Sequence, residues 1–329
     1  MKGIRSYVAD LVGGGAFRRH AADLASAERR IRTIAKHIGG NVGFAAIHIE
    51  SDQILSVNGS RPLPMASTVK LPIAVQVMKR LERGELALDA LVSIESRHVC
   101  PGGGTLAGLR IPGVAVSIEN LLDLALVRSD NTASAALLEL AGGATAVVDL
   151  MNTIGIGGIN IHRSVRQLLI DYYGLTEDEA KEDAKARQLG LLPAAIPAPR
   201  RAAAAAAFLR DARDQSPAMS MASLVAAVWN RRVLEAAQTA VLFDTMARCC
   251  TGRKRLKGLL PAGTRVAHKT GTLPPSMVAD VGIIYLPPPF GHCAVAAVIA
   301  ESGQPMRVQS KGIARMARVV YDLWVSQRV

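Results

Sequence analysis

The chain has 329 residues, of which 50% are hydrophobic and 20% are charged, so it is long enough to bury a large core as one big domain or two lobes. Its net charge of +12 also occurs in proteins that bind nucleic acid, anionic membrane surfaces or acidic substrates. Because the arginines are scattered and only 4% of the residues are aromatic, base stacking is disfavoured and we expect no nucleic-acid partner.

Residues 1–19 are predicted to form an extension ahead of the fold. Their basic start is followed by Tyr7–Phe17, which contains Asp10 and three consecutive glycines and is therefore a poor apolar region for a signal peptide. No run of about 18 apolar residues occurs, so we expect no transmembrane anchor. The four cysteines lack C-x-x-C and zinc-finger spacing and are expected to be buried or free thiols: Cys100, Cys249, Cys250 and Cys293.

Strand patterns lie at both ends of the chain, and helical patterns lie between them. A helix is predicted over residues 20–38, and a hairpin over Val42–Glu50 and Gln53–Val57. Residues 67–250 are mostly helical in pattern, and a last helix covers about 310–327. The three late strands are Arg265–Lys269, Val278–Leu286 and His292–Ala300. An α+β fold follows, with a five-stranded antiparallel sheet built from the chain ends, flanked by helices and carrying an inserted all-helical lobe.

The same pattern predicts two domains. Residues 20–60 plus 260–329 would form the sheet domain, and residues 61–259 the helical domain. Within the helical domain, residues 172–216 contain an acidic-basic segment, a proline-rich piece and six consecutive alanines. The simplest interpretation of this insert is a solvated helix, a linker and another helix, and the functional interpretation is a lid over a site.

The string Ser67-Thr68-Val69-Lys70 opens the amphipathic run Leu71–Leu81, so Ser67 is predicted to be the N-cap of a helix. Lys70 follows three residues later, which puts both side chains on one face. A serine hydroxyl becomes a good nucleophile when a nearby amine of lowered pKa takes its proton. Lys269 is a candidate for the second cation that lowers this pKa. In the alternative interpretation, Ser67 is only a cap and Lys70 is a surface lysine.

The string Ser129-Asp130-Asn131 lies between the helical runs Ile118–Val127 and Thr132–Leu140, and its composition is typical of a capping loop. In a catalytic interpretation, Ser129 relays a proton to a leaving nitrogen. Asn131 would then form hydrogen bonds with a substrate amide.

The string Lys269-Thr270-Gly271-Thr272 follows the β-branched run Thr264–Ala267, so it is predicted to lie on or just after a strand. A glycine there lets a substrate backbone approach closely. The charge of Lys269 and the two threonine hydroxyls would bind a carboxylate. The alternative is an edge strand with a hairpin glycine.

In this order, the three strings are typical of class A beta-lactamases and penicillin-binding proteins. Nearly the whole chain after residue 20, except the insert, resembles a class A beta-lactamase-type serine hydrolase. The resemblance implies Ser67 as nucleophile, Lys70 as general base, Ser129 as proton shuttle, and Asn131 and Lys269 as binding and electrostatic groups. It also implies that Thr270 and Arg255 contact a substrate carboxylate, and that the amides of Ser67 and Thr272 form the oxyanion hole.

The chain departs from this family at the group that activates the deacylating water. The family has an R-x-x-R pattern leading to a glutamate and an asparagine. Aligning Arg163 and Arg166 with the arginines puts Leu168 at the glutamate position and Tyr172 at the asparagine position. The nearest carboxylate is Asp171. Because hydrolysis needs a base for water and acylation does not, we expect Ser67 to acylate readily with β-lactams and to deacylate slowly.

Several functions stay open at this point. The first is hydrolysis of a β-lactam or a related small amide, and the alternative is a D-Ala-D-Ala-type carboxypeptidase or acyltransferase. Both take a small molecule with a carboxylate, and neither requires a cofactor or a metal. A penicillin-binding sensor and a basic nucleic-acid or membrane-surface binder are further possibilities, and salt-dependent DNA retention would support the last. The resemblance implies export to the periplasm, whereas the N-terminus leaves a cytoplasmic location open.

Overall fold

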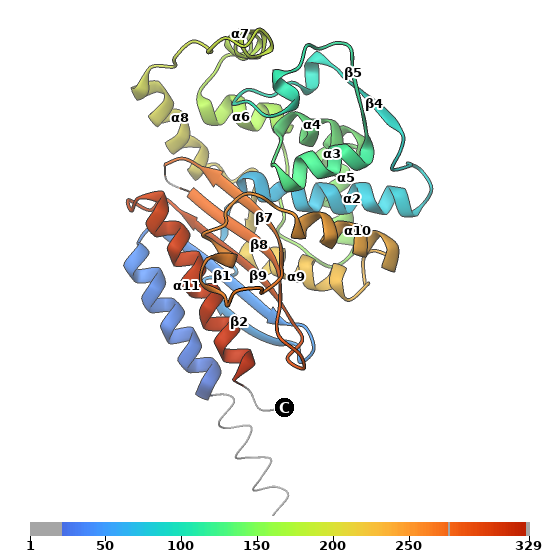
Figure 1. Cartoon of the computed structure of the whole chain (residues 1–329). Coiled ribbons are helices and arrows are strands. Elements are labelled where there is room, and N and C mark those ends of the chain that lie inside the picture. Colours follow the sequence, from blue (N-terminus) through green and yellow to red (C-terminus); the bar gives the residue numbers. More distant parts are fainter. Residues whose placement is uncertain (1–21, 276, 327–329) are drawn as a thin grey trace, which may run out of the picture.

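The computed structural model describes residues 22–275 and 277–326. It contains a five-stranded antiparallel sheet beside a mostly helical half (Figure 1). The strand order is β2-β1-β9-β8-β7, so the two chain ends meet in one sheet as predicted. The strands are β1 (Asn41–His48), β2 (Gln53–Val57), β7 (Val266–Leu273), β8 (Met277–Tyr285) and β9 (His292–Ala300). The predicted α+β sheet is therefore confirmed, although its edge strand β7 runs four residues beyond Lys269.

Both faces of the sheet are covered. The helix over residues 22–38 and α11 (Met306–Val325) lie on one face, and α9 (Ala218–Trp229) packs against the other (Figure 1). Successive side chains of a strand point to opposite faces, so Phe44 joins the core under the two terminal helices and Ala45 joins the core under α9. Full burial of a side chain such as Phe44 stabilises the fold by about 1.5–3 kcal/mol.

The rest of the chain is mostly helical, as predicted. Its helices are α2 (Lys70–Glu82), α3 (Ile118–Val127), α4 (Asn131–Leu140), α5 (Gly143–Thr153), α6 (Val165–Tyr173), α7 (Glu177–Gln188), α8 (Ala198–Arg210) and α10 (Ala236–Ala247). Its 3-10 turns are η1 (Ala66–Val69), η2 (Ser96–His98), η3 (Leu106–Gly108) and η4 (Leu256–Leu259). The division into two domains stays a prediction.

Four short strands in this half were not predicted. They form two separate two-stranded sheets, β3 with β6 and β4 with β5. Their bounds are β3 (Pro62–Pro64), β4 (Leu91–Ile94), β5 (Val114–Ser117) and β6 (Gln215–Pro217). Three or four residues are too few to show an alternating pattern, so the entirely helical description of this half was wrong at these positions.

The predicted insert at residues 172–216 contains α7, a linker and α8, which confirms the helix–linker–helix interpretation. The hydroxyl and the carboxylate of Thr176 and Glu179 cap the start of α7, and α8 packs against α6. Tyr172 in α6 donates a hydrogen bond to the carbonyl oxygen of Pro274, in the turn between β7 and β8. The insert therefore lies next to the end of the sheet that carries the Lys269 string (Figure 1).

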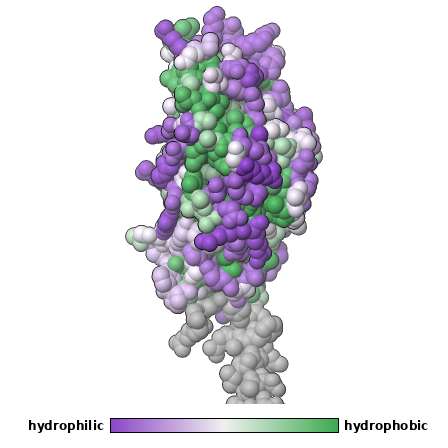
Figure 2. All heavy atoms as spheres, turned by 90° about the vertical axis from the view of Figure 1, so that its right-hand side faces the viewer, coloured by the Kyte–Doolittle hydropathy of each residue, from purple (hydrophilic) through white to green (hydrophobic). Residues whose placement is uncertain are grey.

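The surface seen from the side of β4 and β5 carries a stretch of apolar side chains bordered by hydrophilic ones (Figure 2). Leu91 of β4 is 73% exposed. Among the described residues, no single helix is both long and apolar enough to cross a membrane. Helices α4 and α5 meet that length and composition only as a pair bent by 69°.

The close packing of β7 on β8 predicts the effect of a glycine substitution. A Cβ atom at Gly282 would lie 2.1 Å from the carbonyl oxygen of Ala267. Gly282→Ala is expected to lower the free energy of unfolding by about 1–3 kcal/mol, because the two strands must separate. Gly157→Ala meets no atom within 4 Å and should change that free energy by less than about 0.5 kcal/mol. Chemical denaturation of both variants tests this, and equal losses would contradict it.

Candidate active site

The candidate nucleophile lies in a tight turn between β3 and α2. Ser67 is half-buried in η1, and the preceding Ala66 has a φ of 47°, a conformation that costs non-glycine residues about 1–3 kcal/mol. The helix begins only at Lys70, with Val69 as its uncapped N-cap residue. The predicted N-cap role of Ser67 is therefore wrong, because the 3-10 turn separates Ser67 from the helix start. Of the residues that the structure describes, none forms a hydrogen bond with the Ser67 hydroxyl.

Lys70 is buried, with 2% of its surface exposed, so the surface-lysine alternative is wrong. Its Nζ donates hydrogen bonds to the carbonyl oxygen of Ser129 at 2.6 Å and to Oδ1 of Asn131 at 2.8 Å. Burial lowers the pKa of Lys70 well below its usual value, and the nearby charge of Lys269 lowers that pKa further. Both effects favour the neutral amine, which is the form that can accept a proton.

The Ser129 string caps a helix and also presents side chains to Lys70. Oδ1 of Asp130 accepts the backbone N–H of Ala133 at 2.8 Å at the start of α4, which confirms the capping interpretation for Asp130. Its Oδ2 accepts the N–H of Leu106 at 3.0 Å. Ser129 has a φ of 62°, a left-handed conformation that turns its hydroxyl toward the lysines.

Lys269 lies on β7 with none of its surface exposed. Its Nζ donates to Oγ of Ser129 at 3.0 Å and to the carbonyl oxygen of Thr270 at 2.9 Å. Burial lowers the pKa of Lys269 to about 8. Oγ of Ser129 also lies 3.3 Å from Nζ of Lys70. One serine hydroxyl therefore bridges two buried amines.

Gly271 allows β7 to run directly beside the turn that carries Ser67. A Cβ atom at Gly271 would lie 2.8 Å from the carbonyl oxygen of Met65 and 3.2 Å from Cβ of Ala66. Only a glycine fits this approach without moving one of the two elements. Ser67 and Thr272, whose amides were predicted to form the oxyanion hole, thus lie on two adjoining segments.

Arg255 is buried behind the strand. Its guanidinium donates to the carbonyl oxygens of Gly271 and Ala279 at 2.7 and 2.9 Å, and to Oγ1 of Thr272 at 2.7 Å. Oγ1 of Thr270 shares a hydrogen bond of 2.6 Å with Oγ1 of Thr251. Thr251 had no predicted role, because its only sequence signal was its place in the string Thr251–Arg255 ahead of the last strands.

Comparison with known proteins agrees with this geometry. Residues 26–324 match the model of the Beta-lactamase enzyme family. The chain belongs to this family. Beta-lactamase VEB-1 of Pseudomonas aeruginosa is 24% identical, over 91% of this chain and 90% of the relative. Extended-spectrum beta-lactamase PER-1 of the same organism is 26% identical, over 90% and 86%. The crystal structure of TLA-1 extended spectrum beta-lactamase is 26% identical, with a TM-score of 0.72 over 92% of this chain and 99% of that one. The predicted class A beta-lactamase-type serine hydrolase is confirmed.

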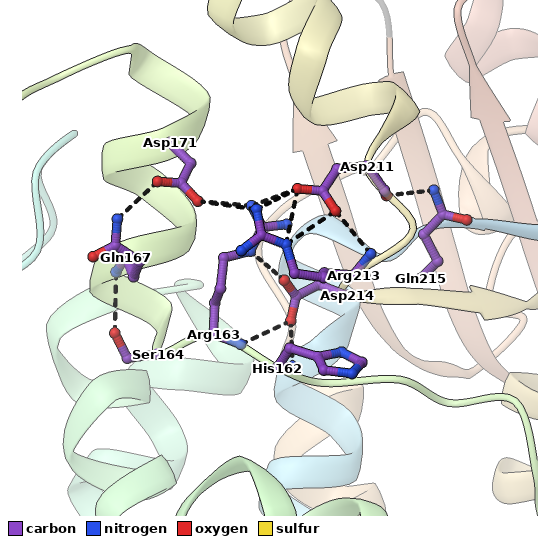
Figure 3. Close-up of polar contacts among 9 residues, drawn as sticks. All are labelled: His162, Arg163, Ser164, Gln167, Asp171, Asp211, Arg213, Asp214 and Gln215. Carbon is purple, nitrogen blue, oxygen red and sulfur yellow. Dashed lines mark hydrogen bonds and ion pairs between the residues drawn. The ribbon is translucent and has the colours of Figure 1, made fainter.

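In this beta-lactamase-family fold, four charged residues join the two ends of the long segment that contains the insert, and we call Arg163, Asp171, Asp211 and Asp214 the neck cluster. Arg163 is the cation of this cluster. It donates from Nη1 to Oδ2 of Asp171 at 2.8 Å and to Oδ2 of Asp211 at 3.3 Å, and from Nε to Asp214 (Figure 3). Asp214 lies 51 residues later in the chain and is 2% exposed. The buried guanidinium also lies over the Phe208 ring, 4.7 Å from its centroid. One arginine therefore ties together both ends of this segment.

The other residues that were predicted to act in this segment lie in helix α6. Leu168 and Tyr172 are buried in α6, at the positions aligned with the family's glutamate and asparagine. Asp171 accepts hydrogen bonds from Arg163 and from Nε2 of Gln167, the latter at 2.7 Å. Arg166 is not part of the neck cluster. It pairs instead with Glu177 at 2.6 Å.

Arg163 and Arg166 provide a matched test of how much the neck cluster stabilises the fold. Arg163→Ala leaves the buried carboxylate of Asp214 without its partner, so the free energy of unfolding should fall by about 3–5 kcal/mol. Arg166→Ala removes a more exposed pair and should cost at most about 1 kcal/mol. Denaturant unfolding of the two variants measures the difference, and equal losses would show that the neck cluster contributes no special stability.

Proposed function

We propose that this enzyme opens a β-lactam ring through an acyl-enzyme on Ser67, and that the acyl-enzyme hydrolyses slowly. The observation that carries the proposal is the single hydroxyl of Ser129, which is held between two buried lysines, Lys70 and Lys269. Among the described residues, the hydroxyl of the neighbouring Ser67 has no hydrogen-bond partner. The names of VEB-1, PER-1 and TLA-1 describe them as beta-lactamases, which supports a β-lactam as the substrate class.

In the acylation step, neutral Lys70 takes the proton of the Ser67 hydroxyl while Oγ attacks the lactam carbonyl carbon. A neutral amine has two N–H groups and one lone pair. The two shortest hydrogen bonds of Lys70, to Ser129 and Asn131, use the N–H groups and orient the lone pair. The lowered pKa of Lys70 keeps this form populated.

A proton is then relayed from Lys70 to the leaving group through Ser129. Its hydroxyl accepts a hydrogen bond from Lys269 at 3.0 Å, so its own proton is free to be donated to the leaving lactam nitrogen. Lys70 replaces that proton across a distance of 3.3 Å. Lys70 returns to its neutral form at the end of the transfer, and the C–N bond of the lactam is broken.

The developing oxyanion and the substrate carboxylate are both assigned to groups along β7. The amides of Ser67 and Thr272 would bind the oxyanion, because Gly271 allows their segments to approach. Lys269 and the hydroxyls of Thr270 and Thr272 would bind the carboxylate. We assign Arg255 and Thr251 as positioning residues, because they hold these two hydroxyls from behind.

Slow deacylation follows from the composition of α6. A leucine and a tyrosine that donates its hydroxyl to Pro274 cannot take a proton from water at neutral pH, and burial raises the pKa of Tyr172 to about 12. Asp171 is the nearest carboxylate in the sequence, and its oxygens are engaged by Arg163 and Gln167. The same observation supports the second candidate, a D-Ala-D-Ala-type peptidase or acyltransferase whose acyl group passes to an amine rather than to water.

Mass spectrometry of the intact protein mixed with benzylpenicillin tests the proposal. A covalent adduct should form within seconds and persist for many minutes on the native chain and on Asp171→Ala, because neither provides a free base for water. Ser67→Ala should form no adduct. Rapid turnover that is lost in Asp171→Ala would contradict slow deacylation and assign the base to Asp171. Faster loss of the adduct when a D-amino acid is added would favour acyl transfer.

The pKa of Lys269 predicts a pH dependence for carboxylate substrates. The protonated amine attracts the carboxylate, so this attraction is present below about pH 8 and is lost as the pH rises through that value. The second-order rate constant for acylation by benzylpenicillin should therefore fall, approaching about tenfold per pH unit above the pKa. The methyl ester of the drug lacks the charge and should show no such loss. Parallel profiles for the acid and the ester would contradict the role of Lys269.

A further inference from the structure

A second group of reactive side chains lies behind β7, apart from the Ser67 site. His268 and Asp280, on β7 and β8, are fully buried, and Nδ1 of the imidazole donates to Oδ1 of the carboxylate at 2.7 Å. Among the described residues, Nε2 of His268 has no hydrogen-bond partner of regular geometry. The His268 imidazole and the Cys249 thiol interact with each other. His268 therefore interacts with a carboxylate through Nδ1 and also with a thiol.

This environment distinguishes Cys249 from the two fully enclosed cysteines. Burial disfavours its thiolate, but the interaction with His268 and the hydrogen bond with Thr251 outweigh that effect and lower the pKa of Cys249 to about 7. In contrast, burial raises the pKa of Cys100 to about 12 and raises that of Cys293 as well. Cys250 is exposed, and its thiol donates to the carbonyl oxygen of Val127 instead.

Cys249 is also connected to the proposed carboxylate site. Its Sγ lies 3.3 Å from Oγ1 of Thr251, which lies 2.6 Å from Oγ1 of Thr270. The loop that carries Thr251 packs tightly against Thr270, because a Cβ atom at the next residue, Gly252, would lie 2.5 Å from Cγ2 of Thr270. An atom added to Sγ of Cys249 would therefore alter its contact with Thr251 and, through Thr251, the hydroxyl of Thr270.

We propose that Cys249, activated by His268 and Asp280, is a site of oxidation by small peroxides, and that its oxidation weakens substrate binding at Thr270. The second part rests on the proposed function. The thiolate attacks one peroxide oxygen, so that an S–O bond forms and the O–O bond breaks. Sulfur loses two electrons, and the departing hydroxide takes the proton of the His268 imidazolium to form water. Cys249 is 5% exposed, so only a reagent close to the size of water reaches it.

Hydrogen peroxide treatment followed by peptide mass spectrometry tests the first part. One oxygen should appear first on Cys249 of the wild-type chain and on Cys249 of a Cys250→Ser variant, with Cys100 and Cys293 unchanged. The bulky reagent dithiobis-nitrobenzoate should react with Cys250 and leave Cys249 unmodified. Oxidation that begins at Cys250, with Cys249 intact, would overturn the proposal.

The pH dependence of the oxidation needs no variant. The charged and titratable groups around the thiol are His268 and Lys269 from β7, Asp280 from β8, Arg255 from its loop and the adjacent Cys250. Between pH 7 and pH 8.5 the oxidation rate of Cys249 should rise about twofold, against about twentyfold for a thiol with a pKa of 9. A twentyfold rise would overturn activation by His268.

The second part is tested by the rate of acylation by benzylpenicillin after peroxide treatment, with each variant compared with its own untreated rate. Wild type and Cys250→Ser should lose at least tenfold, whereas Cys249→Ser should keep its rate. Oxidised Cys249 with an unchanged acylation rate would overturn the link to Thr270. If no variant is acylated before treatment, the proposed function fails while the mass spectra still decide whether Cys249 is oxidised.

Discussion

Two lysine side chains, Lys70 and Lys269, are buried on either side of one serine hydroxyl. Two charged amines in such a dry place repel each other and lose their hydration, so the arrangement favours a neutral form of one of them. The burial of Lys70, together with the charge of Lys269, makes Lys70 the amine that gives up its proton. In the proposed mechanism, this one constraint supplies the base for Ser67 and leaves Lys269 as the charge that attracts a carboxylate.

The surrounding fold keeps the lysine pair in place from three directions. Asp130 caps α4 and fixes the loop that carries Ser129, whose hydroxyl lies between the two amines. Gly271 brings the β7 backbone against the Ser67 turn. Arg255 donates hydrogen bonds to the carbonyl oxygens of Gly271 on β7 and Ala279 on β8 and so holds the two strands together. The chain ends supply the sheet and the middle supplies the loop, so the site exists only when both halves are folded together.

Much of this could be predicted because each catalytic string lies where one element meets another. The hairpin and the late strands are rich in β-branched residues, and the capping function of Asp130 follows from its place before a helical run. The 3-10 turn at Ser67 could not be predicted, because its neighbours are compatible with an ordinary helix start. The partner of Arg163 lies 51 residues away across the insert, a distance over which local pattern carries no information. The roles of the site residues remain proposals.

The most direct measurement of the central claim is the titration of Lys70 by carbon-13 NMR of the lysine ε-carbons, with Lys70→Arg used to assign its signal. The account predicts that the Lys70 amine titrates well below the usual lysine pKa of about 10.4, so that it loses its proton while exposed lysines remain protonated. A Lys70 signal that titrates together with the exposed lysines would contradict the account, because Ser67 would then lack its base.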